Sequence, residues 1–490
     1  MCRPMRLLPA FVVCSLLLAS IGAAQWSGDP AANLLIADRS GPQVQAKIVA
    51  IPGGGFYVSW FDNANGGYDV YLQRLDVAGV EQWSHNGVLV ADRNYGWTMD
   101  YGLGVDTAGC ALLAFNDDRS GGEEVTVARI DPDGNLVWGT DGVQVGSGEV
   151  YQPQVAGTSD GSSVVAWTEG LALKVQKLDP NGAPQWGPGV TISPTSGMFF
   201  VADVKGSDAG NAIVSWVHGG YPNPPHLWAQ KLASADGALL WGAGGVAVCD
   251  GDSLQMGNFP PFVSDGEGGA VFSWYINSAP GDYFLQCRVQ RVLANGSEAF
   301  AHNGVNVSTF PTRQRVGPSA AFLPDTDEVV VFWAETDYLQ DQYGLYGQKL
   351  DASGARQWTD SGVELVPLSG NLISSVTTLP FADGAMVAWV DSVAYLTNEP
   401  LRGTRVDGNG DFVWATPIVD LSTVATPKSD VVGALSTAGY GAFAWTDGDE
   451  VSTSDIPAQN LNGDGSLGSS ALFIDGFESG DTTAWSVTVP

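Results

Sequence analysis

One short apolar motif that ends in an aromatic residue recurs along almost the whole chain. The copies lie at Phe56–Trp60, Leu112–Phe115, Ser163–Trp167, Ala212–Trp216, Ala270–Trp274, Val329–Trp333, Ala385–Trp389 and Gly441–Trp445. Their terminal aromatic residues recur on average every 55 residues. Short, near-continuous apolar runs are typical of buried strands. A fixed period of this length indicates a repeat architecture, in which each unit buries its apolar face against the next.

A second series follows the first at the same period. Its copies read as strand, Asx-Gly turn and strand, as in VYLQRLDVAGVEQW, and they close at Trp83, Trp138, Trp186, Trp241, Phe300, Trp358 and Trp414. The turn glycine supplies the positive φ that a tight hairpin needs. A variable stretch, a weaker strand and a second Gly turn come next. Each unit is therefore predicted to hold four short antiparallel strands.

The eighth copy of the second series stops before its closing tryptophan, at Ala458–Gly468. The missing piece is found at the other end of the sequence. Gln25-Trp26 followed by NLLIADR matches Gln82-Trp83 followed by GVLVADR. We therefore expect the N-terminal strand to complete the eighth unit. Such a splice closes a ring and removes the exposed sheet edges of an open array.

These repeats, of the form VxW…QxLDxxGxxxW, resemble those of β-propellers and are similar to repeats of secreted bacterial proteins. The resemblance covers residues 25–470. It implies an all-β fold: an eight-bladed β-propeller of four-stranded antiparallel blades, closed by the N-terminal strand, with seven blades as the alternative count. It implies a fold and no particular chemistry.

Both ends of the chain carry features of export. Arg3 and Arg6 precede an apolar stretch from Leu7 to Ile21, and Gly22-Ala23-Ala24 offers small residues for cleavage. This pattern predicts a signal peptide over residues 1–24; the alternative is an uncleaved membrane anchor. No later stretch is long and apolar enough to span a bilayer.

The C-terminal segment, residues 471–490, reads ALFIDGFESGDTTAWSVTVP. It resembles a DGFESGDTxxW-type tail of exported proteins from Gram-negative bacteria. The resemblance implies a sorting or surface-attachment signal, with a strand that caps the last blade as the alternative. We therefore expect a protein that is secreted or held at the cell surface of a Gram-negative bacterium.

The charge of the chain narrows the class of partner. Asp and Glu number 53 against 21 Lys and Arg, which gives a net charge of −32. This charge argues against nucleic acid and against an anionic lipid surface as partners. Outside the signal, Cys110, Cys249 and Cys287 lie in strand-like apolar runs. We expect them to be small buried hydrophobic residues, with a Cys249–Cys287 disulfide as an open alternative.

No metal or cofactor site is expected. His85 and His302 occupy the same turn position in two repeats, and His218 and His226 share a loop that has no cysteine or carboxylate triad beside it. Two segments, at residues 407–411 and 460–465, have the oxygen pattern of a calcium loop. Both are the hairpin turn of the repeat, so a turn is favoured over a calcium site.

The four connections of each unit divide between two rims, because the strands alternate in direction. One rim carries the repeated Gly turns, whereas the other carries connections that vary in length and content, as binding loops on a scaffold do. Exposed aromatic residues among carboxylates suit a glycan or a protein ligand, and packing of loop against loop is the alternative. The predicted ligand-binding residues of this variable rim are Tyr95, Trp97, Asp117, Asp118, Tyr221, Trp228, Tyr275, Tyr283, Tyr338 and Tyr343.

No linear motif for catalysis is found in a suitable context, neither GxSxG, HExxH, a P-loop nor a dinucleotide fingerprint, and no catalytic residue is predicted. The sequence therefore favours an exported, monomeric, non-catalytic binding or surface-interaction protein that holds a glycan or a protein. One alternative is a hydrolase or lyase whose acids converge on the ring axis from several blades. The other is a purely structural surface protein.

Overall fold

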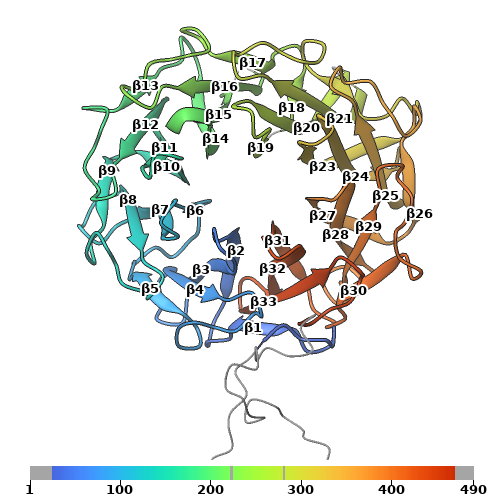
Figure 1. Cartoon of the computed structure of the whole chain (residues 1–490), viewed down its shortest axis with the longest axis horizontal. Coiled ribbons are helices and arrows are strands. Elements are labelled where there is room, and N and C mark those ends of the chain that lie inside the picture. The colour runs from blue at the N-terminus through green and yellow to red at the C-terminus, as the bar shows by residue number, and fades with distance from the viewer. Residues whose placement is uncertain (1–24, 221–223, 256, 280–281, 470–490) are drawn as a thin grey trace, which may run out of the picture.

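The computed structural model describes residues 25–220, 224–255, 257–279 and 282–469, so the predicted signal peptide and C-terminal tail lie outside the described residues. Within the described part of the chain the strands form eight antiparallel sheets, arranged as blades around a central channel (Figure 1). The protein is an eight-bladed β-propeller, as the repeats predict. The alternative count of seven blades is wrong.

The first four blades follow the chain in order. Blade 1 holds β2 (Gln43–Ala50), β3 (Phe56–Asp62), β4 (Asp69–Leu75) and β5 (Val88–Ala91). Blade 2 holds β6 (Gly102–Val105), β7 (Ala111–Asp117), β8 (Glu124–Ile130) and β9 (Val143–Ser147). Blade 3 holds β10 (Val150–Gly157), β11 (Ser163–Glu169), β12 (Ala172–Leu178) and β13 (Val190–Ile192). Blade 4 holds β14 (Met198–Gly206), β15 (Ala212–Gly219), β16 (His226–Leu232) and β17 (Val246–Cys249), with a short 3-10 turn, η1 (Asp208–Gly210).

The remaining blades continue around the ring. Blade 5 has a split inner strand, β18 (Ser253–Leu254) and β19 (Phe262–Ser264), followed by β20 (Ala270–Ala279), β21 (Asp282–Val292) and β22 (Val305–Asn306). Blade 6 holds β23 (Gln314–Leu323), β24 (Glu328–Thr336), β25 (Tyr343–Leu350) and β26 (Val363–Ser369). Blade 7 holds β27 (Leu372–Phe381), β28 (Gly384–Ser392), β29 (Leu401–Val406) and β30 (Ile418–Ser422). Blade 8 holds β31 (Lys428–Leu435), β32 (Tyr440–Asp449), β33 (Thr453–Asn462) and β1 (Leu34–Ala37).

The second strand of each blade forms the core between neighbouring blades. β3, β7 and β28 are buried at every residue, as expected for strands that are covered on both faces. The tryptophans that end the first repeat series are among the largest fully buried side chains: Trp60, Trp216, Trp274, Trp333, Trp389 and Trp445. The apolar repeat is therefore the packing surface that joins one blade to the next.

The ring closes through its N-terminal strand. β1 pairs antiparallel with β33, and Leu34 lies opposite Ala458. Just before β1, the indole Nε1 of Trp26 donates to the backbone oxygen of Val77 in blade 1 at 3.3 Å. Trp26 thus occupies the place that the missing closing tryptophan of the eighth unit would take, which confirms the splice predicted from the sequence.

The closing aromatic of each unit packs against the hairpin glycine of the next. A Cβ added at any of these glycines would come within 3.3 Å of the neighbouring aromatic ring, and each glycine has a positive φ. The eight pairs are Trp26–Gly79, Trp83–Gly134, Trp138–Gly182, Trp186–Gly237, Trp241–Gly296, Phe300–Gly354, Trp358–Gly410 and Trp414–Gly465. Glycine is therefore needed at these positions for two reasons: the turn requires a positive φ, and the aromatic ring leaves no room for a Cβ.

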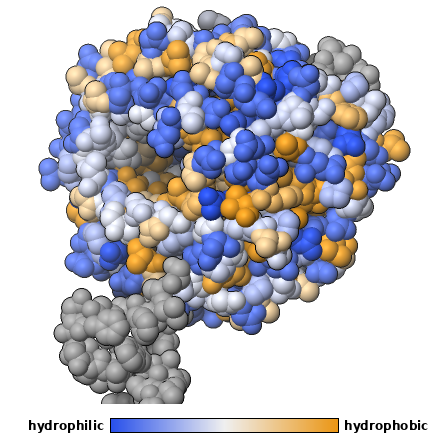
Figure 2. Space-filling view, turned by 45° about the vertical axis from the view of Figure 1, so that its right-hand side comes forward, coloured by the Kyte–Doolittle hydropathy of each residue, from blue (hydrophilic) through white to orange (hydrophobic). Residues whose placement is uncertain are grey.

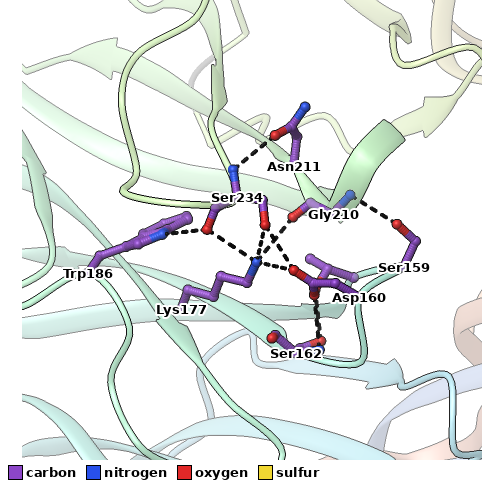
Figure 3. A network of polar contacts seen from close by, with 9 residues as sticks. Ser159, Asp160, Ser162, Lys177, Trp186, Gly210, Asn211 and Ser234 are labelled. Atoms are coloured by element: carbon purple, nitrogen blue, oxygen red, sulfur yellow. Dashed lines mark hydrogen bonds and ion pairs between the residues drawn. The ribbon is translucent and has the colours of Figure 1, made fainter.

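A buried cation reinforces these contacts between blades. In Figure 3, the amine of Lys177 in blade 3 lies 2.5 Å from the Asp160 carboxylate and 2.6 Å from the Ser234 hydroxyl of blade 4. The indole of Trp186 donates to the backbone oxygen of the same Ser234 at 3.0 Å. Basic residues at the same place in other blades reach the next hairpin turn in the same way, among them Arg74, Arg129, Lys231 and Arg405.

The three cysteines of the described chain, Cys110, Cys249 and Cys287, are buried and free. Burial raises the pKa of each thiol. The structure therefore agrees with their expected role as small core residues, and the alternative Cys249–Cys287 disulfide is not formed.

Candidate functional site

The two rims of the propeller differ in how their carboxylates are used. On the repeated rim, Asp351 accepts hydrogen bonds from the backbone amides of Ser353 and Ala355. The Ser353 hydroxyl and these amides lower the pKa of the Asp351 carboxyl. Asp407 accepts from the amides of Asn409 and Asp411 in the same pattern. The acids of the repeated turns thus stabilise their own hairpins.

The variable rim carries the most exposed apolar side chains. Among the described residues, seven large apolar side chains are at least half exposed, with values between 50% and 88%. They are Leu171, Tyr338, Leu339, Val393, Tyr395, Leu396 and Val451. All seven lie in loops between the second and third strands of a blade, and six of them belong to blades 6, 7 and 8. We call these six residues the apolar tips.

A pocket opens beside the apolar tips, between the loops of blades 7 and 8. It has a volume of about 380 Å³ and is lined by Leu396, Glu399, Pro427, Lys428, Ser429, Gly448, Asp449 and Glu450. The Lys428 amine is turned inward, where it donates to the backbone oxygen of Val424 at 2.7 Å. The charges that remain near the surface of this pocket are carboxylates.

Tyr95 and Trp97 meet on the loop between blades 1 and 2. Their rings make an edge contact at 5.1 Å, and Trp97 remains nearly half exposed while Tyr95 is buried. The Arg93 guanidinium lies 5.3 Å from the Tyr95 ring and donates to the backbone oxygen of Asn116 at 2.6 Å. Burial raises the pKa of Tyr95 to about 12. Of this predicted pair, only Trp97 presents its ring to solvent.

Asp117 is the last residue of β7 in blade 2, and Asp118 begins the loop that follows it. Asp117 is buried and forms an ion pair with Arg119 at 2.7 Å. Asp118 accepts a hydrogen bond from the backbone amide of Asn94, which ties its loop to the one that carries Tyr95. The structure therefore brings four predicted residues of blades 1 and 2 together, and both carboxylates serve to hold the loops in place.

The other predicted aromatic residues are dispersed over blades 4 to 6. Trp228 lies within β16, opposite Trp216, at the strand position that Tyr71 and Tyr346 occupy in other blades. Tyr275 and Tyr343 are half-buried in strands. Tyr338 is exposed and belongs to the apolar tips. Tyr221 and the side chain of Tyr283 lie outside the described residues.

The site residues predicted from the sequence are aromatic residues and two aspartates, and they include none of the exposed aliphatic residues. Leu339, Leu396 and Val451 are among the most exposed apolar side chains of the described chain, yet none was predicted as a site residue. The signal that could have found Leu339 and Leu396 is a leucine in the middle of the connection between the second and third strands of a unit, as in DYLQD and SVAYLTNE. An apolar residue without packing partners at a loop tip is informative, whereas a half-buried aromatic residue is not.

The central channel is a second candidate. It encloses about 540 Å³ and is lined by the inner strands of all eight blades. Blades 1 to 4 contribute Lys47, Asp100, Gln154, Asp203 and Lys205, whereas blades 5 to 8 contribute small and apolar residues. On the face in Figure 2, hydrophobic residues line the central hollow and hydrophilic ones surround it.

Most of the polar groups of the channel join one blade to another. The Asp100 carboxylate lies 2.6 Å from the amine of Lys47 in blade 1 and accepts from the amide of Gln154 in blade 3 at 2.8 Å. Asp203 pairs with Lys205 at 2.8 Å and accepts from the backbone amide of Phe262 in blade 5. These two carboxylates are therefore neutralised and held in place by their neighbours.

Asp430 directly precedes the channel-lining residues of β31, and it accepts a hydrogen bond from the Thr446 hydroxyl at 3.3 Å. It is the third residue of β31, its side chain is exposed, and its φ is 49°. Gln45, Gln152 and Ser375 have a similar positive φ at the bulge of the inner strand in blades 1, 3 and 7, so this backbone conformation is a feature of the repeat. Burial among the surrounding loops and the nearby Glu450 raise the pKa of its carboxyl group. A raised pKa is a property of catalytic acids, and structural groups show it as well.

The two histidines of blade 4 do not form a metal centre. His218 and His226 lie opposite each other on β15 and β16, and the His218 ring bonds to the backbone oxygen of Ser196 at 2.7 Å. Across the part of the chain that the structure describes, no group of three or more His, Cys, Asp or Glu is placed to hold a metal ion. No helix within the described ranges is long and apolar enough to cross a membrane.

Comparison with known proteins does not assign the chain to a family. No protein-family model matches the chain, and no curated protein matches it. Among solved structures, a protein of unknown function from Dyadobacter fermentans is 11% identical with a TM-score of 0.41, covering 87% of this chain and 96% of its own. The polysaccharide lyase Uly1 is 9% identical with a TM-score of 0.44, over 89% and 92% of the two chains. The Dos1 propeller is 11% identical with a TM-score of 0.45, over 88% and 95%.

Proposed function

We propose that this propeller is an exported, non-catalytic binding protein that contacts a protein partner through the variable rim of blades 6, 7 and 8. One observation carries the proposal. Every large apolar side chain that is at least half exposed in the described chain lies on that rim, and six of the seven lie on three consecutive blades. Exposed apolar residues that gather in one region mark interaction surfaces.

The chemistry of the apolar tips favours a protein over a glycan. Leu339, Leu396 and Val451 gain by leaving water, at roughly 25 cal/mol per Å² of apolar area buried, but they offer no polar group to a sugar hydroxyl. Trp228 and Tyr343 are largely packed into the blades, whereas Tyr338 and Tyr395 among the apolar tips have exposed rings. The four aliphatic residues of the apolar tips therefore carry the preference for a protein. The pocket of about 380 Å³ between blades 7 and 8 is large enough for a side chain of the partner.

The cellular location of the protein is part of the same proposal. Residues 1–24 and 471–490, outside the described residues, supply the signal peptide and the sorting or attachment tail. The protein would act as a monomer that is secreted or held at the surface of a Gram-negative cell. The net charge of −32 directs it away from nucleic acids and anionic lipid.

The test compares three forms of the mature protein in affinity capture. The first is the wild type, the second carries Leu339→Ser, Leu396→Ser and Val451→Ser, and the third carries Val77→Ser, Val137→Ser and Val413→Ser on the repeated rim. All three control positions are also exposed. We expect one protein to be captured by the wild type and the control and to be lost from the rim variant. Equal capture by all three forms would contradict the proposal, and a glycan-array signal lost only in the rim variant would replace the protein by a glycan.

A hydrolase or lyase in the channel is the second candidate, and Asp430 is the observation that favours it. The raised pKa of its carboxyl group is a property that a general acid beside the channel would have. The test is to incubate the protein with a panel of polysaccharides and to measure new reducing ends and unsaturated uronate absorbance. Activity that Asp430→Asn abolishes would establish this candidate. No turnover, or turnover that the variant keeps, would remove it.

A further inference from the structure

Two histidines on opposite sides of the ring are held between carboxylates in the same way. The Nδ1 atom of His85 lies 3.1 Å from both carboxylate oxygens of Glu81, and its Nε2 atom lies 3.1 Å from Oδ1 of Asp38. His302 repeats this arrangement, with Nδ1 at 3.1 and 3.0 Å from Glu298 and Nε2 at 3.0 Å from Asp250.

This arrangement selects one protonation state. A neutral imidazole carries a hydrogen on one nitrogen and a lone pair on the other. With a carboxylate at each nitrogen, the neutral ring would direct its lone pair at a negative charge. Only the imidazolium donates to both carboxylates, and both contacts then become charge-assisted hydrogen bonds.

The electrostatics of both sites point in the same direction. Burial opposes protonation of His85, but hydrogen bonds and charge from Glu81 and Asp38 outweigh it and raise the pKa of the imidazole. Glu298 is the main cause of the raised pKa of His302, with Asp250 as the second partner. These four carboxylates are the titratable groups that face the two rings, from the histidine's own blade and from the blade packed against it.

Each histidine joins two different blades. Asp38 directly follows β1, the N-terminal strand that completes blade 8, whereas His85 precedes β5 of blade 1. Asp250 directly follows β17 of blade 4, and His302 precedes β22 of blade 5. Blades 1 and 5 lie across the ring from each other (Figure 1). One of the two contacts therefore lies beside β1, the strand that closes the ring.

The residue after each histidine strengthens the same junction. Asn86 accepts from the backbone amide of Asp38 at 2.9 Å, and Asn303 accepts from that of Asp250 at 2.7 Å. Another unit holds the equivalent junction with groups that do not titrate near neutral pH. There, the backbone amide of Thr309, which follows β22 of blade 5, donates to the backbone oxygen of Asp360 in blade 6 at 2.9 Å.

We propose that His85 and His302 are proton-dependent clamps, whose carboxylate contacts between blades 1 and 8 and between blades 5 and 4 form fully only while the imidazoles are protonated. A group whose pKa is raised on folding adds stability that is complete below its unfolded pKa of about 6.5 and is lost as the pH rises through the folded value. The two seams of the exported ring are therefore firmer in acidic than in alkaline surroundings. This inference is independent of the partner proposed above.

The first test is an NMR titration of the four histidines, assigned with single variants. We expect His85 and His302 to titrate above about 6.5, whereas His226, whose pKa is lowered by burial, titrates below it. Asp38→Asn should lower the midpoint of His85 and leave that of His302 unchanged. Midpoints of His85 and His302 at or below the free value would overturn the proposal.

The second test measures urea unfolding between pH 5.5 and 9 for the wild type, the double variant His85→Gln with His302→Gln, and the control His226→Gln. We expect the stability gap between wild type and double variant to be largest at pH 5.5 and to shrink as the pH rises. The control should keep the pH dependence of the wild type. A gap that is constant with pH would reduce both histidines to ordinary packing and would contradict the proposal.

Discussion

The side-chain amide of Gln459 donates a 2.7 Å hydrogen bond to the backbone oxygen of Ser27, 432 positions earlier in the chain. In other units a glutamine makes the same bond within its own blade, as Gln348 does to the backbone oxygen of Thr359 at 2.6 Å. The eighth unit therefore uses the device of the repeat, but its partner comes from the other end of the sequence. The hydrogen bond that helps to close the ring is thus the same bond that a glutamine makes within other blades.

Gln459→Leu should weaken the closure of the ring. The side chain is fully buried, and its loss leaves the Ser27 oxygen without a donor, at a cost of about 1–3 kcal/mol in the free energy of unfolding. Gln348→Leu is the matched control, because it removes the same bond inside a blade. Urea unfolding should show similar losses for both variants, but only Gln459→Leu should speed hydrogen exchange in β1. Equal exchange in β1 for the two variants would contradict this account of closure.

Phe300 marks the one seam whose closing aromatic lacks an indole. Trp358 donates to the backbone oxygen of Gly408 at 3.0 Å, and the other closing tryptophans make equivalent bonds. We predict that Phe300→Trp raises the free energy of unfolding by about 1 kcal/mol and that Trp358→Phe lowers it by a similar amount. Calorimetry on the two variants checks both signs. Destabilisation by Phe300→Trp would show that the Gly354 turn cannot accept the larger ring.

The ion pair of Arg315 and Glu335 is fully buried in blade 6, with 3.2 Å between Nε and Oε2. Arg315→Met should cost about 3–5 kcal/mol, because it leaves a buried carboxylate without its cation. The double variant Arg315→Met with Glu335→Leu should recover most of this loss. Urea unfolding of the two variants and the wild type measures both effects.

The ion pair of Arg315 and Glu335 also predicts that the stability loss of Arg315→Met depends on pH. Burial already raises the pKa of Glu335 and would raise it further without Arg315. A carboxyl group whose pKa is raised on folding binds more protons in the folded state, so stability falls as the pH rises. The deficit of Arg315→Met should therefore be larger at pH 7 than at pH 4.5. A deficit that is the same at both values would contradict this explanation.

The sequence predicts the fold almost completely, because the residues that pack one blade against the next recur in all eight units. Trp26 was assigned to the eighth blade from its similarity to Trp83 alone, and the structure places it there. Trp228 shows the limit of this reasoning, since it was assigned to the variable rim but lies in a strand, opposite Trp216. The loop before it varies in length, which obscured its alignment with Tyr71 and Tyr346.

The sequence predicts that the candidate site lies on the variable rim, but it does not identify the residues that form it. Exposure at a loop tip depends on what the neighbouring blade presents, and this is a contact between residues about one repeat apart in the sequence. His85 and His302 were recognised as one repeat position, but their carboxylate partners Asp38 and Asp250 lie in the preceding blade. A linear search does not reveal such pairs.

The most direct test of the account is photo-crosslinking of the protein in the cells that export it. Benzoylphenylalanine is placed at Leu339 and Leu396 on the variable rim and, in separate variants, at Val77 and Val413 on the repeated rim. The account predicts one protein adduct from positions 339 and 396 and none from positions 77 and 413. Adducts from the repeated rim alone, or none from any position, would contradict the assignment of blades 6 to 8 as the contact surface.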